Sequence, residues 1–303
     1  MSDAQGPSGG GKLGEIPYLR LPRPEALFAR RADRFAELSR GHTLAEFLEF
    51  LSHVARAQLA AWETLAPLPS PPQGERARER GSRGPAGAAS WRDALKVIVA
   101  DLSARAIPAE SRAALDRLQR APREDLEALA ARVLENAAAG SDLAAGPFVA
   151  AALQVEYTDR ASRTDPAAVA RADSGCPVCG SLPVVAVVLG DDRLRYLVCS
   201  LCATQWHHTR IQCTACRGAE GLAYYALQGE RAASVPVMDS VKAEACPRCK
   251  AYTKLLYFEK DPRIEPFADD VATLALDLLM AESGWARHGV NVFLMPAAAD
   301  ASA

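Results

Sequence analysis

The stretch that decides the fold runs from Cys176 to Cys216 and reads CPVCGSLPVVAVVLGDDRLRYLVCSLCATQWHHTRIQCTAC. It contains three Cys-x-x-Cys pairs, and a fourth pair follows at Cys246 and Cys249. Two thiolates at this spacing can turn toward one cation, and two such pairs complete a tetrahedron around zinc or iron. Because all eight cysteines of the chain belong to these pairs, the sequence predicts two four-thiolate metal sites.

The residues between the pairs favour a sequential arrangement. An apolar run at 182–189, a turn at 190–192 and a second apolar run at 194–198 predict a hairpin between the first and second pairs. The third and fourth pairs repeat this plan, with a strand predicted at 222–227 and a longer connection. The alternative is a cross-braced arrangement that joins pairs one and three and pairs two and four. Sequential pairing predicts two tandem ribbons, the first holding Cys176, Cys179, Cys199 and Cys202, and the second holding Cys213, Cys216, Cys246 and Cys249.

The same cysteines would also suit a disulfide framework, because small secreted domains often carry an even number of cysteines in a compact region. The chain begins MSDAQGPSGGG, without the apolar segment of a secretory signal. No apolar run approaches the roughly 20 residues that a bilayer-spanning helix needs. We therefore expect a cytoplasmic protein with reduced thiols and no membrane insertion.

Length and charge limit the function classes. With 303 residues, 49% of them apolar, the chain can bury a core in each of two parts. Its formal net charge is −2, and residues 176–262 hold ten Lys/Arg against eight Asp/Glu. A surface that follows a phosphate backbone needs a larger positive excess. The charge therefore argues against a nucleic-acid partner.

Residues 15–172 have the apolar period of helices and predict an all-helical domain. The predicted helices cover about 25–39, 44–62, 91–105, 110–120, 123–139 and 147–154, the last with a continuation. A capping box from Thr43 to Glu46 is expected to begin the second of them. Residues 67–90, rich in Pro, Gly and Arg, predict a mobile loop, and residues 1–14 predict a disordered segment.

The predicted architecture is α+β in two parts. Ribbon modules at 173–211 and 212–262 follow the helical domain, and 263–303 form a C-terminal helix and tail. This helix is predicted at 264–283, with Asp269 and Asp270 in its first turn. The two carboxylates would complement the helix dipole there or contact a basic partner. The sequence does not separate these two roles.

The run from Arg195 to Cys216, with CPRC at 246–249, FEKD at 258–261 and ADD at 268–270, resembles the formate dehydrogenase accessory protein family FdhE. The likeness is sharpest over 176–296, where NVFL at 291–294 is similar to the family's C-terminal signature. The family commonly has an acidic residue where this chain has Gln205. The resemblance implies a cytoplasmic maturation factor, not an enzyme, that binds the catalytic subunit of a molybdenum- or tungsten-dependent formate dehydrogenase. It also implies two iron ions, one in each rubredoxin-like set of four cysteines.

The chemistry of such sites narrows the mechanism. Four thiolates leave a metal no open coordination position, so hydrolytic or Lewis-acid catalysis at the metal is disfavoured. Iron would permit one-electron transfer, whereas zinc, the alternative metal, would make the ribbons rigid docking surfaces. Two other functions stay open: a nucleic-acid-binding zinc-ribbon protein and a self-standing rubredoxin-like electron carrier. Metal analysis with a visible spectrum would test them, because red protein with about two irons per chain favours the maturation factor and the electron carrier over the nucleic-acid-binding protein.

The span WHHTR, from Trp206 to Arg210, must join the two ribbons. A structural role is the simpler expectation, with Trp206 packed between ribbons and His207 hydrogen-bonded nearby. Because thiolates already fill both sites, histidine is not needed as a ligand. Association of the chain with itself stays open. The candidate partner-binding residues are Trp206, His207, Arg210, Asp269 and Asp270.

Overall fold

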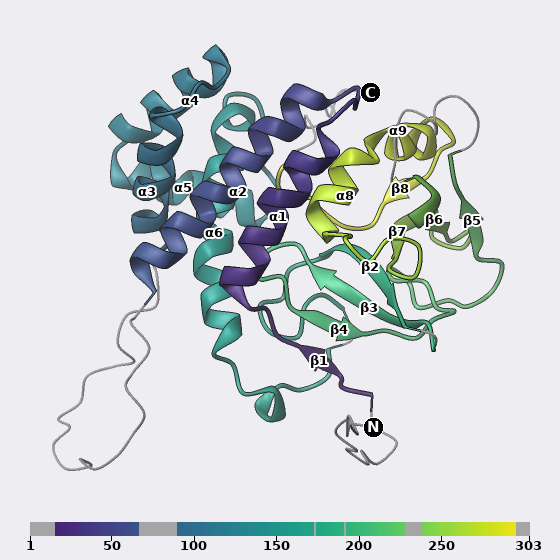
Figure 1. Cartoon of the computed structure of the whole chain (residues 1–303). Coiled ribbons are helices and arrows are strands. Elements are labelled where there is room, and N and C mark those ends of the chain that lie inside the picture. The colour runs from purple at the N-terminus through teal and green to yellow at the C-terminus, as the bar shows by residue number, and fades with distance from the viewer. Residues whose placement is uncertain (1–15, 67–89, 173, 191, 228–237, 295–303) are drawn as a thin grey trace, which may run out of the picture.

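The computed structural model describes residues 16–66, 90–172, 174–190, 192–227 and 238–294. The helices that precede residue 163 gather on one side, and a twisted sheet with the two C-terminal helices beside it lies on the other (Figure 1). One continuous cluster of buried apolar side chains runs through both parts. The predicted disorder at 1–14 and nearly all of the predicted loop at 67–90 lie outside the described residues.

The helical half contains the six predicted helices. They are α1 (Pro24–Leu38), α2 (Ala45–Leu65), α3 (Trp91–Ser103), α4 (Ala109–Arg120), α5 (Arg123–Leu134) and α6 (Asp142–Ser162). Two boundaries differ from the prediction, since α5 ends earlier and α6 begins before Pro147, which lies inside it. The predicted capping box is wrong. Leu44 is the N-cap of α2 without a side-chain cap, and its N–H donates to Nδ1 of His42 at 2.9 Å.

The strands of the two cysteine-bearing modules form one sheet. The described strands are β1 (Leu19–Arg20), β2 (Pro183–Leu189), β3 (Leu194–Cys199), β4 (Gln205–His207), β5 (Ala223–Tyr225), β6 (Val241–Ala245), β7 (Ala251–Tyr257) and β8 (Ala286–Arg287). Their order is β1-β4-β3-β2-β7-β6-β5, with β8 paired to β7. Strand β7 was not predicted, and its parallel pairing with β2 joins the ribbons, with Val187 opposite Leu256. The two four-cysteine β modules are thus present in the predicted order, and the β2–β7 pairing, which was not predicted, joins them in one sheet.

The C-terminal helix is broken. Helices α8 (Pro266–Ala272) and α9 (Leu274–Glu282) meet at Thr273, where one helix was predicted. Buried Lys254 of β7 donates through Nζ to the carbonyl oxygens of Asp270 and Thr273, at 2.9 and 3.1 Å. These bonds satisfy carbonyl groups at the end of α8, so the break is held by a side chain from the sheet.

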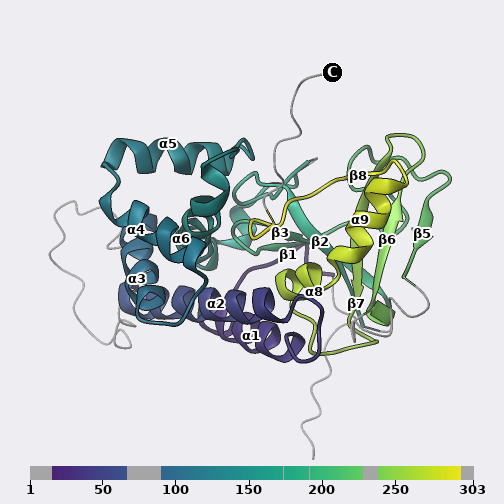
Figure 2. The same cartoon turned by 90° about the horizontal axis from the view of Figure 1, so that it is seen from above.

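Helix α8 lies between the two halves, with α1 on one side and the sheet on the other (Figure 2). The ring of Phe293 packs edge-on against Phe35 of α1 and Phe267 of α8, with centroids 6.2 and 6.3 Å away. The C-terminal NVFL run therefore packs against both the helical half and α8. Among the described helices, none combines the length and the apolar character that crossing a bilayer requires.

Candidate metal centres

The eight thiols gather in two groups of four, as sequential pairing predicts. Within each group the sulfurs lie within 4.8 Å of one another. The cross-braced arrangement is wrong, because Cys176 and Cys213 belong to different groups. We call the groups site 1 (Cys176, Cys179, Cys199 and Cys202) and site 2 (Cys213, Cys216, Cys246 and Cys249).

The sulfur spacing fits a tetrahedral metal. The Sγ–Sγ distance is 3.6 Å for Cys176 and Cys202 and 3.4 Å for Cys179 and Cys199. In site 2 the two corresponding distances are 3.6 and 3.7 Å. Metal–sulfur bonds of about 2.3 Å would place two sulfurs of a tetrahedron about 3.8 Å apart. The thiols are thus spaced for a four-coordinate ion, and they are too far apart for disulfides.

All four Cys-x-x-Cys pairs share one backbone turn. In each pair, the backbone N–H of the first cysteine donates to the carbonyl oxygen of the residue five positions later. Examples are Cys176 to Ser181 at 2.8 Å and Cys246 to Ala251 at 2.9 Å. The residue after the second cysteine has positive φ in every pair, although glycine occupies this position in only one. These residues are Gly180 (82°), Ala203 (56°), Arg217 (61°) and Lys250 (58°).

Backbone donors and burial set the electrostatics of the thiols. In site 1 the N–H groups of Leu201 and Cys202 donate to Sγ of Cys199, both at 3.4 Å. Burial nevertheless raises the pKa of the Cys199 thiol well above its ordinary value and that of Cys213 to about 12. Four thiols so close together, most of them buried, would not all ionise without a compensating cation, and a divalent or trivalent metal would supply it.

Site 1 is built into the core. Cys199 and Cys202 are fully buried, and the Cys199–Cys202 turn faces helix α6. From that helix, buried Gln154 donates through Nε2 to the carbonyl oxygen of Ser200 at 2.8 Å. Oε1 of the same amide accepts from Nη1 of Arg31 on α1 at 3.0 Å. A hydrogen-bonded path therefore connects site 1 with two helices of the other half.

Site 2 lies toward the other end of the sheet and is partly open. Cys216 and Cys249 are half-buried. Arg195 of β3 supports the first turn of this site, because its Nη2 donates to Oγ1 of Thr214 at 2.7 Å. The other end of the same guanidinium pairs with Glu244 of β6 at 2.8 Å, and both side chains are buried.

The WHHTR span has a mainly structural environment. Trp206 lies in β4, paired with β3 and β1, and is buried. The ring of His207 meets Tyr196 edge-on at 5.7 Å. Nε2 of His208 contacts the carbonyl oxygen of Gln212 at 3.1 Å, and burial lowers its pKa to about 4. Only Arg210 of the three candidate partner residues in this span has an exposed side chain.

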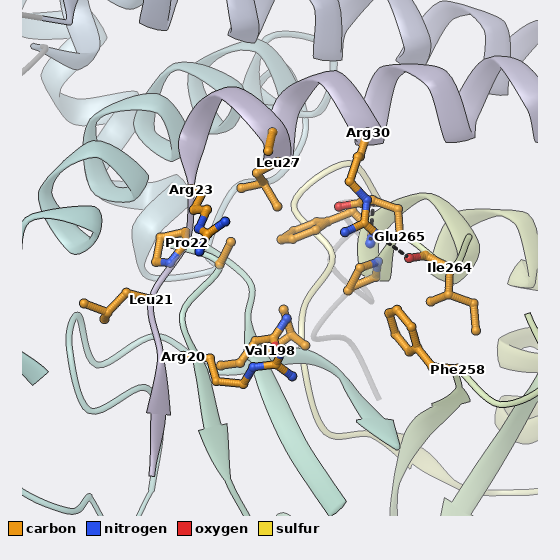
Figure 3. Close-up of a pocket in the computed structure, with 15 residues that line it drawn as sticks. Arg20, Leu21, Pro22, Arg23, Leu27, Arg30, Val198, Phe258, Ile264 and Glu265 are labelled. Atoms are coloured by element: carbon orange, nitrogen blue, oxygen red, sulfur yellow. Dashed lines mark hydrogen bonds between the residues drawn. The ribbon is translucent and has the colours of Figure 1, made fainter. Parts of the chain in front are cut away.

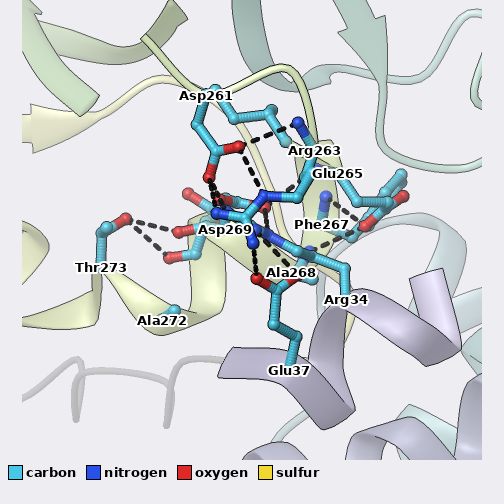
Figure 4. Close-up of polar contacts among 12 residues, drawn as sticks. Arg34, Glu37, Asp261, Arg263, Glu265, Phe267, Ala268, Asp269, Ala272 and Thr273 are labelled. Atoms are coloured by element: carbon cyan, nitrogen blue, oxygen red, sulfur yellow. Dashed lines mark hydrogen bonds and ion pairs between the residues drawn. The ribbon is translucent and has the colours of Figure 1, made fainter. Parts of the chain in front are cut away.

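Asp269 and Asp270 are fully buried, which corrects the hypothesis that they meet a partner at the surface. Asp269 pairs with Arg34 of α1 at 2.7 Å (Figure 4). Asp270 pairs with Arg287 at 2.7 Å and with Lys254 at 3.2 Å. Burial opposes ionisation of Asp270, but these two cations hold its pKa below the usual value. The acidic pair therefore joins α1, α8, β7 and β8 within the fold.

Sequence reasoning missed the cations of this network. Arg31 and Arg34 stand on the buried face of α1 together with Phe28 and Phe35. The spacing of residues 28, 31, 34 and 35, which places them on one helix face, could have predicted buried ion pairs, because charged residues on an apolar helix face require partners. Lys254 gave a weaker signal within a strand that was not itself predicted.

Comparisons with known proteins agree with this arrangement. Three family models match consecutive parts of the chain: the FdhE N-terminal domain over 16–173, the central domain over 175–210 and the C-terminal domain over 211–294. A protein described as an FdhE homolog from Edwardsiella ictaluri is 38% identical and covers 94% of both chains. A second, from Yersinia enterocolitica, is 39% identical, with 95% of this chain and 94% of that one covered.

A solved structure has the same fold. The crystal structure of the FdhE protein from Pseudomonas aeruginosa matches with a TM-score of 0.76 and 34% sequence identity, over 93% of this chain and 100% of that one. Sequence models, relatives and structure thus agree over nearly the whole length. The chain belongs to the FdhE family.

Proposed function

We propose that this protein is a maturation factor that binds the catalytic subunit of a molybdenum- or tungsten-dependent formate dehydrogenase and is required for its activity. The observation that carries the proposal is the pair of closed four-cysteine sites within a family fold of accessory proteins. Each group has the donors of a complete tetrahedron, which leaves a substrate no place at the metal. The proposed action is therefore through contact with a partner, in the cytoplasm and without catalysis by the chain itself.

The donor set fits iron as well as zinc, and we propose one iron ion in each site. Iron held by four thiolates would supply a one-electron couple, whereas zinc would supply a rigid tetrahedral link. With either metal, the chain holds the four sulfurs of each site in place and donates backbone N–H groups to them, and in site 1 it buries three of the four thiols. Metal analysis and a visible spectrum on protein purified without oxygen would test this. Two colourless zinc ions per chain would contradict the iron assignment.

The maturation role is testable in cells. A strain without this protein should accumulate catalytic subunit that oxidises formate poorly, and the wild-type gene should restore activity. Double Cys→Ser variants at either site should fail to restore it. The purified protein should retain the catalytic subunit in a pull-down. Restored activity with both sites removed would contradict a role for the metals, and a failed pull-down with no change in formate oxidation would contradict the function itself.

The other two function classes have separate tests. A zinc-ribbon protein that binds nucleic acid would retain DNA or RNA in a manner that weakens steeply with salt, which the net charge of −2 opposes. A self-standing electron carrier would show reversible absorbance changes and would need no catalytic subunit for its role. Retention of that subunit by the purified protein favours the maturation factor over both.

A further inference from the structure

A cavity of about 560 Å³ opens at the seam between the two halves, and we call it the arginine cleft. Three arginines line it: Arg20 from β1, Arg23 from the link to α1, and Arg30 from α1 (Figure 3). Residues of β3 and β4 and of the segment that leads into α8 complete the lining. Apolar side chains fill the space between the cations, among them Leu21, Leu27 and Phe258.

The positive charge of the cleft is not balanced by its lining. Glu265 is the only acid among the described lining residues, and it is already occupied. Its carboxylate pairs with buried Arg31 at 3.1 Å and accepts from the N–H groups of Phe267 and Ala268 at 3.0 and 2.8 Å. Within the described part of the chain, none of the three lining arginines forms an ion pair.

Two further features of the cleft favour an acidic ligand. Helix α1 has fifteen residues and begins beside the cleft, with Arg23 as its N-cap and no side chain capping its first N–H groups. The helix dipole therefore adds partial positive charge at this point. Gln205 of β4 is the cross-strand partner of Arg20, and its Oε1 is buried without a hydrogen-bond partner among the described residues. A peptide ligand could donate a backbone N–H to this amide oxygen while its carboxylates meet the arginines.

The position of the cleft connects it with site 1. Val198 and Ala203 line it, and these residues directly precede Cys199 and follow Cys202. A partner segment in the cleft would touch the helical half and the site 1 turn at the same time. That placement would bring a bound partner to the more deeply buried metal site.

We propose that the arginine cleft docks an acidic, partly apolar segment of the formate dehydrogenase catalytic subunit. The inference rests on the proposed function, which supplies the partner. A segment with two or more carboxylates would neutralise the guanidinium groups, while its apolar side chains would cover Leu21, Leu27 and Phe258. Charge complementarity of this kind raises the association rate and selects the partner more than it adds affinity.

The test is binding of purified catalytic subunit to the full-length protein at low and high salt. The triple variant Arg20→Glu, Arg23→Glu and Arg30→Glu should bind at least about tenfold more weakly at low salt, mainly through slower association, and should lose most of the salt dependence. The matched control changes Arg117, Arg120 and Arg123 to Glu, which alters charge equally on the exposed faces of α4 and α5. Circular dichroism and metal content should be unchanged in both variants.

Placing a photo-cross-linking benzoylphenylalanine at Leu27 identifies the ligand directly. We expect the cross-linked peptide of the catalytic subunit to contain at least two Asp or Glu residues. Equal loss of binding in the control triple variant, undiminished binding in the cleft variant, or a cross-link to a basic segment would each overturn the proposal. Those results would leave the proposed function intact as long as the wild-type protein binds the subunit. Absence of wild-type binding would instead contradict the function.

Discussion

The two four-cysteine sites have one local geometry and two different surroundings. Both are built from paired turns with the same backbone hydrogen bonds. Site 1 has fully buried thiols at Cys199 and Cys202 and a hydrogen-bonded link through Gln154 to the helices. In site 2 one thiol of each pair, at Cys216 and Cys249, is half-buried, whereas in site 1 this holds for Cys179 alone. The shared turns give both sites the same arrangement of sulfurs, but their different packing leads us to expect that loss of the metal disturbs more of the fold at site 1 than at site 2.

The largest expected effect is on folding. Cys199→Ser should remove the site 1 metal and disrupt the core between the halves, because structural metal binding contributes on the order of 10 kcal/mol to the folding of small domains. Cys216→Ser should remove about one metal per chain and leave the helical half folded. Metal content and thermal unfolding monitored by circular dichroism would measure both. If the two variants were equally stable, the proposed difference between the sites would be wrong.

The next largest effect concerns the buried ion pairs that Asp270 of α8 forms with Lys254 of β7 and Arg287 of β8. Asp270→Asn should lower the free energy of unfolding by about 3–5 kcal/mol, because Lys254 and Arg287 would lose a buried counter-charge. The control is Asp93→Asn, whose partner Lys96 is exposed on α3. That change should cost no more than about 1 kcal/mol. Denaturant unfolding would compare them, and similar losses in the two variants would contradict the argument.

A smaller change should act on site 1 alone. Gln154→Leu removes the donor to Ser200 and the acceptor for Arg31, which should cost about 1–3 kcal/mol. We also expect a chelator to remove the site 1 metal faster, while removal from site 2 keeps its rate. Gln119→Leu, on the exposed face of α4, is the control. Unchanged chelation kinetics at site 1 would show that the link to the helices does not protect it.

The smallest effect tests the shared turn. Gly180→Ala should lower the free energy of unfolding by about 1 kcal/mol, because φ at this residue is 82°, which alanine adopts less readily than glycine. The cost should be no larger, because an added Cβ would meet nothing within 4 Å. Site 2 already tolerates Arg217 and Lys250 at the corresponding positions. The control is Gly140→Ala, at φ 56° with open space and far from both sites. A loss of metal in Gly180→Ala but not in Gly140→Ala would show that this turn needs glycine for coordination.

Local patterns predicted the parts of the fold that depend on neighbours in sequence. The period of apolar residues predicted the helices to within a few residues, except where α5 ends early and α6 begins early. The hairpin between the first two cysteine pairs was also visible, since turn residues separate two apolar runs. Strand β7 was missed because Lys254 interrupts its apolar pattern. Its buried partners Asp270, Asp277 and Thr273, which come from α8, α9 and the break between them, make a lysine acceptable there.

Cys-x-x-Cys spacing and helical periodicity are properties of residues close together in the chain, so they were enough to predict the helical half and to favour the observed two sets of thiols. Only the tertiary structure decided that the ribbons share one sheet through β2 and β7. It also decided that Asp269 and Asp270 are internal counter-charges rather than surface groups. The physical reason is that burial and ion pairing depend on cations distant in the chain, Arg34 for Asp269 and Lys254 and Arg287 for Asp270. Spacing along the sequence cannot show which of these distant charges will meet.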